Sequence, residues 1–125
     1  MKANILVIED NEQNLYLITY ILEKRGHTII SAMDGESGIK TAGKVKPDII
    51  LLDIQLPGMD GYEVAKRLKS IPELNDIPIV AVTSYAMVGD REKALESGCT
   101  GYIEKPINPE TFTEEVESYL KNRKE

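Results

Sequence analysis

The chain has 125 residues, of which 42% are hydrophobic and 29% are charged, and its formal net charge is −6. This length and composition predict one globular domain over residues 1–125. The acidity argues against general binding to nucleic acid or to an anionic membrane, because excess positive charge supplies most of that attraction. The single cysteine, Cys99, excludes an internal disulfide and a cysteine-rich zinc site, so a metal would have to be held by oxygens. No apolar stretch approaches the roughly 20 residues of a membrane span or forms a signal peptide, which predicts a cytoplasmic protein.

Short apolar runs alternate with amphipathic stretches along the chain. The runs predict strands at residues 5–8, 27–30, 48–53, 77–82 and 101–103. The intervening stretches predict five helices. The first has an apolar stripe and ends near Gly26, the second and third are capped by Asp34 and Asp60, and the fourth covers about residues 86–97. The fifth has Asn108 as N-cap and Pro109 as its first residue. Five repeats of strand and helix imply an α/β fold, with a doubly wound parallel sheet covered by helices on both faces.

Polar side chains stand where the predicted strands end. Glu9 and Asp10 follow the first strand, Asp53 closes the third, Thr83 follows the fourth and Lys105 follows the fifth. In such sheets, sites form beyond the carboxyl ends of the strands, so these groups are expected to converge. Three carboxylates facing one ammonium repel one another, and a divalent cation would balance their charge. Mg²⁺ suits such a site because it prefers oxygen ligands and often binds carboxylates together with phosphate.

The same residues resemble a known family, the receiver domains of bacterial two-component response regulators. The matching motifs are Ile5 to Asn11, Asp48 to Asp53, Leu56 to Gly61, Val82-Thr83, and Gly98 to Tyr102 with Lys105-Pro106. Each motif alone is common, but the ordered set covers essentially the whole chain. Within the family, the chain is most similar to stand-alone, single-domain receivers of the DivK-like kind.

The resemblance implies a flavodoxin-like fold of five parallel strands in the order 2-1-3-4-5 with five helices. It also implies site roles. Asp53 would accept a phosphoryl group, and Lys105 and Thr83 would contact the phosphoryl oxygens. Mg²⁺ (or Mn²⁺) would be ligated by Asp10, Asp53 and the backbone carbonyl of Gln55, with Glu9 acting through water. Thr83 and Tyr102 would form the switch that responds to phosphorylation. The Lys105-Pro106 peptide bond would be cis.

The function implied is that of a phosphorylation-activated signalling protein, not an enzyme in the usual sense. A histidine kinase or a histidine phosphotransfer protein would donate the phosphoryl group, docking near the first helix at residues 14–18. A downstream protein target would contact residues 86–120, or the phosphoryl group would be relayed onward. We expect no direct contact with nucleic acid or membrane, and a monomer or a weak phosphorylation-dependent dimer.

Other interpretations remain open from the residues alone. A phosphohydrolase of the haloacid-dehalogenase kind also uses a strand-end aspartate with Mg²⁺, but it typically needs a second aspartate where Gln55 stands. A flavodoxin-like electron carrier needs a phosphate-binding loop after the first strand, where acidic residues would repel the phosphate. The chain could also be a piece of a longer regulator, although Met1 and Glu125 closely flank the predicted elements.

His27 is expected at the surface, Cys99 in a partly buried position, and Tyr85 beside the approach of water to Asp53.

Overall fold

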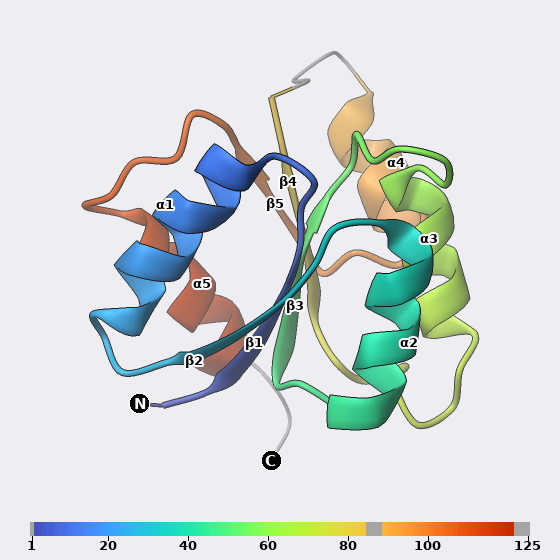
Figure 1. The fold of residues 1–125 in the computed structure, drawn as a ribbon. Helices are drawn as coiled ribbons and strands as arrows, with labels where there is room; N and C mark the ends of the chain where they lie inside the picture. Colours follow the sequence, from blue (N-terminus) through green and yellow to red (C-terminus); the bar gives the residue numbers. More distant parts are fainter. Residues whose placement is uncertain (1, 85–88, 122–125) are drawn as a thin grey trace.

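The computed structural model describes residues 2–84 and 89–121, in which a central parallel sheet lies between two layers of helices (Figure 1). The strands are β1 (Asn4–Ile8), β2 (Thr28–Ala32), β3 (Ile49–Asp53), β4 (Ile79–Thr83) and β5 (Gly101–Glu104). The helices are α1 (Glu12–Glu23), α2 (Gly35–Val45), α3 (Gly61–Lys69), α4 (Asp90–Glu96) and α5 (Phe112–Lys121). All strand pairs are parallel and the order is β2-β1-β3-β4-β5, which confirms the predicted flavodoxin-like fold.

The sheet separates two hydrophobic cores. Side chains of a strand alternate between its faces, so Ile5 and Val7 of β1 pack toward α1 and α5, whereas Leu6 and Ile8 pack toward α2, α3 and α4. Figure 1 shows these two groups of helices on opposite sides of the sheet. Strands β3 and β4 are buried along their whole length, as expected for the centre of a parallel sheet. No helix in the described part of the chain is long and apolar enough to cross a membrane.

Helix α2 forms although its glycines lower its intrinsic helix propensity. Its N-cap Asp34 accepts a hydrogen bond from the backbone N–H of Ser37, as predicted from the sequence. The glycines allow close packing, because a Cβ at Gly38 would lie only 2.5 Å from Cδ1 of Ile8. A larger residue at this position would therefore force the Ile8 side chain to shift.

Helix α5 begins later than predicted. The sequence predicted Asn108 as N-cap and Pro109 as the first helical residue, but the helix runs from Phe112 to Lys121. The Asn108 side chain does accept a hydrogen bond from the Glu110 backbone N–H, and its carbonyl accepts from Thr111 and Phe112. Asn108 therefore caps a turn over residues 109–111 that leads into the helix. The described part of the fourth helix, Asp90–Glu96, ends one residue before the predicted end, and the predicted start of that helix, with Tyr85, lies outside the described residues.

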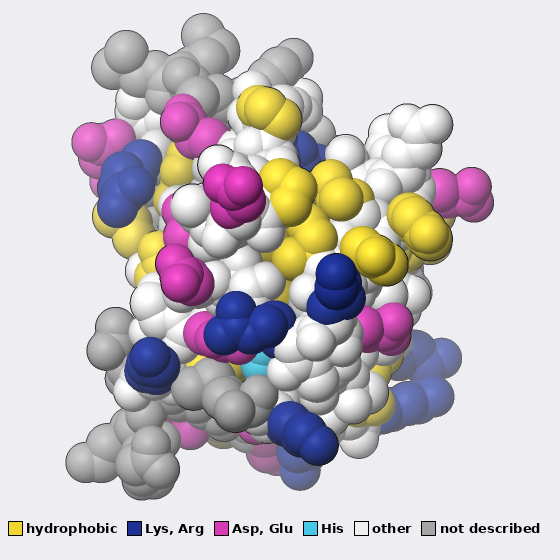
Figure 2. Space-filling model, turned by 90° about the vertical axis from the view of Figure 1, so that its left-hand side faces the viewer, with side chains coloured by type: hydrophobic (Ala, Val, Ile, Leu, Met, Phe, Trp, Pro, Cys, Tyr) yellow, Lys and Arg dark blue, Asp and Glu magenta, His cyan; other side chains and the backbone are white. Residues whose placement is uncertain are grey.

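His27 is buried, and the expectation of a surface position was wrong. The residue is 3% exposed, its side chain is fully buried, and the ring lies between the start of β1 and α5. The Ala3 backbone N–H donates to His27 Nδ1 at 3.1 Å, and His27 Nε2 lies 2.8 Å from Oε2 of Glu117. Because Nδ1 accepts, the proton is on Nε2 and is donated to Glu117, whose other oxygen accepts from Arg25 at 3.1 Å. Figure 2 shows only a small part of this single histidine, between the side chains that surround it.

Replacing Glu117 with Gln should lower the free energy of unfolding by about 1 kcal/mol, because the two carboxylate oxygens accept from His27 and from Arg25 separately. Gln keeps only one acceptor oxygen, so one of these hydrogen bonds weakens and the other is lost. Urea denaturation monitored by circular dichroism measures this difference. Glu114→Gln on the same helix is the control, since Glu114 is exposed and should leave stability nearly unchanged. Equal effects of the two substitutions would contradict a stabilising role of the buried network.

Candidate functional site

Three carboxylates meet at the carboxyl ends of β1 and β3. Glu9 and Asp10 directly follow β1, Asp53 is the last residue of β3, and the two strands are neighbours in the sheet. One carboxylate oxygen from each residue lies within 4.8 Å of the other two. Glu9 and Asp53 are buried and Asp10 is exposed, so the cluster opens to solvent on the side of Asp10. The structure thus brings together three residues that are 44 positions apart at most in the chain.

Lys105 enters the same cluster from the loop after β5. Its ammonium Nζ lies 3.0 Å from Oε1 of Glu9 and 3.9 Å from Oδ2 of Asp53, so Glu9 is its closer partner here. The other carboxylate oxygen of Glu9 accepts a hydrogen bond from the Asn11 backbone N–H at 3.2 Å. Glu9 is therefore held in place from two sides. The Lys105-Pro106 peptide bond is cis, which confirms that prediction.

Thr83 and Gln55 border the cluster. Thr83 closes β4 one position beyond Val82, the partner of Asp53 in the sheet register, and is 1% exposed. Its carbonyl accepts a hydrogen bond from the Lys105 backbone N–H at 2.8 Å. The Gln55 backbone N–H donates to Oδ1 of Asp53 at 3.1 Å.

Ser84 is a neighbour of the site that sequence reasoning did not select. Its hydroxyl donates to Oε1 of Gln55 at 3.3 Å, which links the loops that follow β3 and β4. Its position directly after the strand-end Thr83 is the signal by which sequence reasoning could have selected it.

The environment of Asp53 disfavours its negative charge. Burial, and then the neighbouring Glu9 carboxylate, raise the pKa of Asp53 to about 6, while the Gln55 N–H and the Lys105 ammonium oppose this rise. A hard cation placed among the three carboxylates would relieve the same repulsion. The donor set, which consists of carboxylate oxygens with two buried members, fits Mg²⁺ and offers nothing to a thiol-seeking metal.

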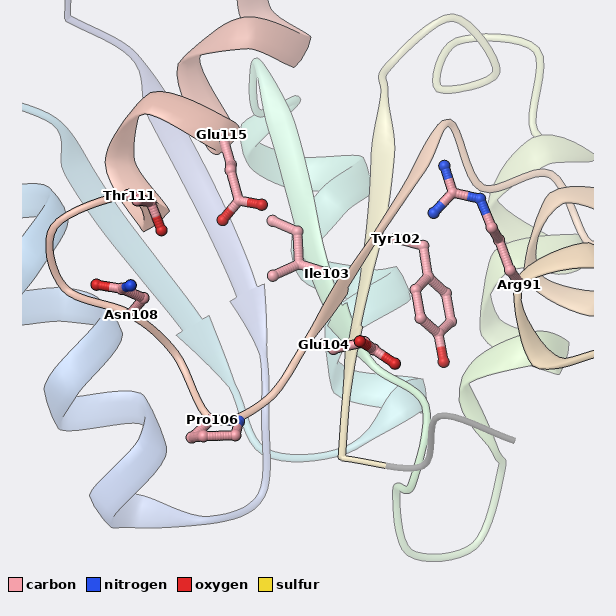
Figure 3. A pocket seen from close by; sticks show the side chains of 8 residues that line it. All are labelled: Arg91, Tyr102, Ile103, Glu104, Pro106, Asn108, Thr111 and Glu115. Carbon is pink, nitrogen blue, oxygen red and sulfur yellow. The ribbon is translucent and has the colours of Figure 1, made fainter. Parts of the chain in front are cut away.

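Tyr102 lies away from the carboxylates, in the wall of a groove between α4 and α5. The groove has a volume of about 510 Å³, and its lining residues are Arg91, Tyr102, Ile103, Glu104, Pro106, Asn108, Thr111 and Glu115. Figure 3 shows the Tyr102 ring between Arg91 and Glu104. Burial, followed by the carboxylates of Asp90 and Glu104, raises the pKa of Tyr102, so this phenol remains protonated at neutral pH.

Sequence comparison identifies relatives over nearly the whole chain. The family model of the response regulator receiver domain matches residues 5–117. The polar-differentiation response regulator DivK of Brucella anthropi is 42% identical over 120 residues, which cover 96% of this chain and 98% of DivK. DivK of Brucella ovis shows the same identity and coverage.

Structure comparison agrees with this result. A putative response regulator from Chloroflexus aurantiacus superposes with a TM-score of 0.92 at 25% identity, covering 98% of this chain and all of that one. The receiver domain of the sensor histidine kinase PA1611 from Pseudomonas aeruginosa superposes with a TM-score of 0.84 at 30% identity, covering 98% of both chains. That receiver carries a magnesium ion in its active-site cleft. The chain belongs to the response regulator receiver domain family, and both DivK relatives have nearly its own length.

Proposed function

We propose that this protein is a phosphorylation-controlled signalling module of a two-component phosphorelay, with Asp53 as the phosphoryl acceptor. The observation that carries the proposal is the position of Asp53, which is buried at the end of β3 beside two further carboxylates and 3.9 Å from the Lys105 ammonium. The family assignment decides against the phosphohydrolase and electron-carrier alternatives. The chain as a whole, residues 1–125, would act as one receiver domain.

A divalent cation fits the cluster. Asp10, Asp53 and the backbone carbonyl of Gln55 would hold Mg²⁺, or Mn²⁺ in its place, and Glu9 would contribute through a bound water. When bound, the ion would offset the negative charge that accumulates between the carboxylates and the incoming phosphoryl group.

The residues of the chain then have distinct tasks in phosphoryl transfer. A carboxylate oxygen of Asp53 attacks phosphorus, and the electrons of the phosphorus–nitrogen bond leave with the imidazole of the donor histidine. Lys105 would turn from Glu9 toward the phosphoryl oxygens, a short movement because its ammonium already lies between Glu9 and Asp53. The Thr83 hydroxyl, on the neighbouring strand end, would donate a hydrogen bond to one of the same oxygens.

Incubation with acetyl phosphate and Mg²⁺ should add the mass of one phosphoryl group, and the Asp53→Asn variant should lose this label completely. Intact-mass spectrometry measures both. Asp60→Asn is the matched control, because Asp60 is an exposed N-cap of α3 that Asn can replace. Labelling of the Asp53→Asn variant at the wild-type level, or labelling that persists in the presence of a chelator, would disprove the proposed site.

Two faces are available for protein partners. Hydrophobic side chains gather on the face that carries α1 (Figure 2), and we assign docking of the histidine kinase or phosphotransfer protein to the part of this face near Asn14 to Ile18. The groove beside Tyr102 would receive the downstream target, with Thr83 and Tyr102 transmitting the phosphorylation state. Its rim carries Glu104 and Glu115, both exposed. A cytoplasmic location, and a monomer or weak phosphorylation-dependent dimer, belong to the same proposal.

A further inference from the structure

Helix α4 is weakly anchored by its own apolar residues. It has seven residues, all of them described, and Ala94 alone among them is buried. Its N-cap, Gly89, has a φ of 95° and provides no side chain to cap the first turn. Contacts that reach α4 from neighbouring elements therefore have a large share in fixing its position.

Tyr62, in the first turn of α3, makes two such contacts. Its hydroxyl donates a long hydrogen bond of 3.5 Å to Oδ1 of Asp90, and the Lys93 ammonium lies 4.6 Å from the centroid of its ring. Asp90 and Lys93 are three positions apart and so share one side of α4. Burial, and then the Asp90 carboxylate, raise the pKa of Tyr62, so the hydroxyl keeps its proton and remains a donor. One aromatic ring thus holds both turns of the short helix.

The backbone of Tyr62 is in turn tied to the strand that ends in Asp53. The N–H of the preceding Gly61 donates to the carbonyl of Ile54 at 2.9 Å. A Cβ at Gly61 would lie 2.6 Å from Cα of Ile54 and 2.7 Å from the carbonyl oxygen of Asp53. The start of α3 is therefore packed directly against the backbone of the acceptor residue, without an intervening side chain.

Tyr62 also shares a core with Tyr102. Both rings are partly buried and pack against the hydrophobic core between the sheet and the helices α2, α3 and α4. A displacement of the α3 start would accordingly be felt by α4 and, through the shared core, by the wall of the groove.

We propose that Tyr62 is a positioning residue that couples the backbone at Asp53 to α4, by a route separate from the Thr83 hydroxyl. The contacts of Tyr62 with Asp90 and Lys93, here called the clamp on α4, exist in the unmodified protein. The part of this clamp in signalling rests on the proposed function of Asp53. In the unmodified protein the ring would hold α4 against α3, and a shift of the β3–α3 connection on phosphorylation would move α4 with it.

Amide hydrogen exchange of the unmodified protein tests the clamp. In Tyr62→Leu, which keeps an apolar side chain but loses the ring and hydroxyl, exchange in α4 should become about three to ten times faster. Tyr62→Phe keeps the ring under Lys93 and should restore most of the protection. Tyr16→Leu is the matched control, because Tyr16 is 72% exposed on α1 and should leave α4 unchanged. Unchanged exchange in Tyr62→Leu, or an equal loss of protection throughout α3, would overturn the proposal.

Beryllofluoride, a phosphoryl mimic, tests the coupling. Thr83→Ala should retain part of the NMR shift change that this mimic causes in α4, and adding Tyr62→Leu should remove the remainder. If Thr83→Ala alone abolishes the α4 response, or if the double variant responds as Thr83→Ala does, Tyr62 provides no separate route. Labelling by acetyl phosphate tells the two proposals apart. If wild type is not labelled, Asp53 is refuted as the acceptor, and the hydrogen-exchange result for α4 still stands. If Tyr62→Leu is labelled, the acceptor site of that variant is intact.

Discussion

Replacing Asp53 with Asn should raise the free energy of unfolding of the metal-stripped protein at pH 7 by about 1–2 kcal/mol, although it removes the acceptor group. The reason is the crowding of three carboxylates around one ammonium, with Asp53 and Glu9 both buried. Asparagine has nearly the same shape and can still accept the Gln55 N–H, but it carries no charge to be desolvated or repelled. Thermal or urea denaturation in the presence of a chelator measures the difference.

The effect of Asp53 on stability should depend on pH in a defined direction. The pKa of Asp53 is about 6 in the folded protein and 3.8 for the unperturbed group. A raised pKa means that the folded state binds more protons than the unfolded state between these values, so ionisation of Asp53 reduces stability as the pH rises from about 4 to about 6. The advantage of Asp53→Asn should therefore be small near pH 4, grow across this window and stay constant above it.

Magnesium should make wild type more stable than Asp53→Asn, the reverse of the order expected in the chelator. Binding of Mg²⁺ to the folded state stabilises it by mass action, and Asp53→Asn, with one carboxylate fewer, should gain less than wild type. Asp60→Asn controls for an Asp-to-Asn change outside the cluster and should follow wild type in both conditions. If Asp53→Asn were less stable than wild type in the chelator at pH 7, the repulsive character of the cluster would be refuted.

Gly61→Ala should destabilise the protein by about 2–3 kcal/mol, because the new methyl group meets rigid atoms. Its ideal position lies 2.6 Å from Cα of Ile54 and 2.7 Å from the carbonyl oxygen of Asp53, both backbone atoms that cannot rotate away. Relief requires the start of α3 to separate from the end of β3, which would also displace the Asp53 carboxylate. We therefore expect labelling by acetyl phosphate to slow by at least about tenfold, since small errors in position are costly in group transfer.

Gly43→Ala is the matched control for this substitution. Gly43 lies inside α2, and a Cβ there would have nothing within 4 Å. Alanine should stabilise the helix by about 0.5–1 kcal/mol through its higher propensity and leave labelling unchanged. If both alanine variants had the same stability, close packing of α3 against Asp53 would not be the reason for glycine at position 61.

Much of the architecture follows from local patterns. The buried apolar runs of β1, β3 and β4 and the caps Asp34 and Asp60 lie where the sequence predicts them, because each depends on residues close in the chain. The resemblance to receivers supplied the strand order, since crossover connections of similar length are compatible with several orders. The start of α5 was predicted too early because the Asn108 signal marks the beginning of a turn as well as that of a helix.

The residue types at the strand ends were enough to predict a carboxylate cluster, since parallel strands bring their carboxyl ends to one edge of the sheet. Which charges pair there was not predictable. Lys105 lies closer to Glu9 than to Asp53, and this pairing depends on the placement of the loop that carries Lys105, which is 96 residues further along the chain than Glu9.

The sequence by itself determined the alternation of strands and helices, the acidic edge of the sheet and the family, because these depend on periodicity and on ordered motifs. The tertiary structure alone decided the burial of His27 against Glu117 and the contact of Tyr62 with α4. His27 and Glu117 are 90 residues apart, and Tyr62 and Asp90 are 28 apart. Nothing in the local sequence of either partner marks such a pair, because the contact exists only once elements that are distant in the chain have packed together.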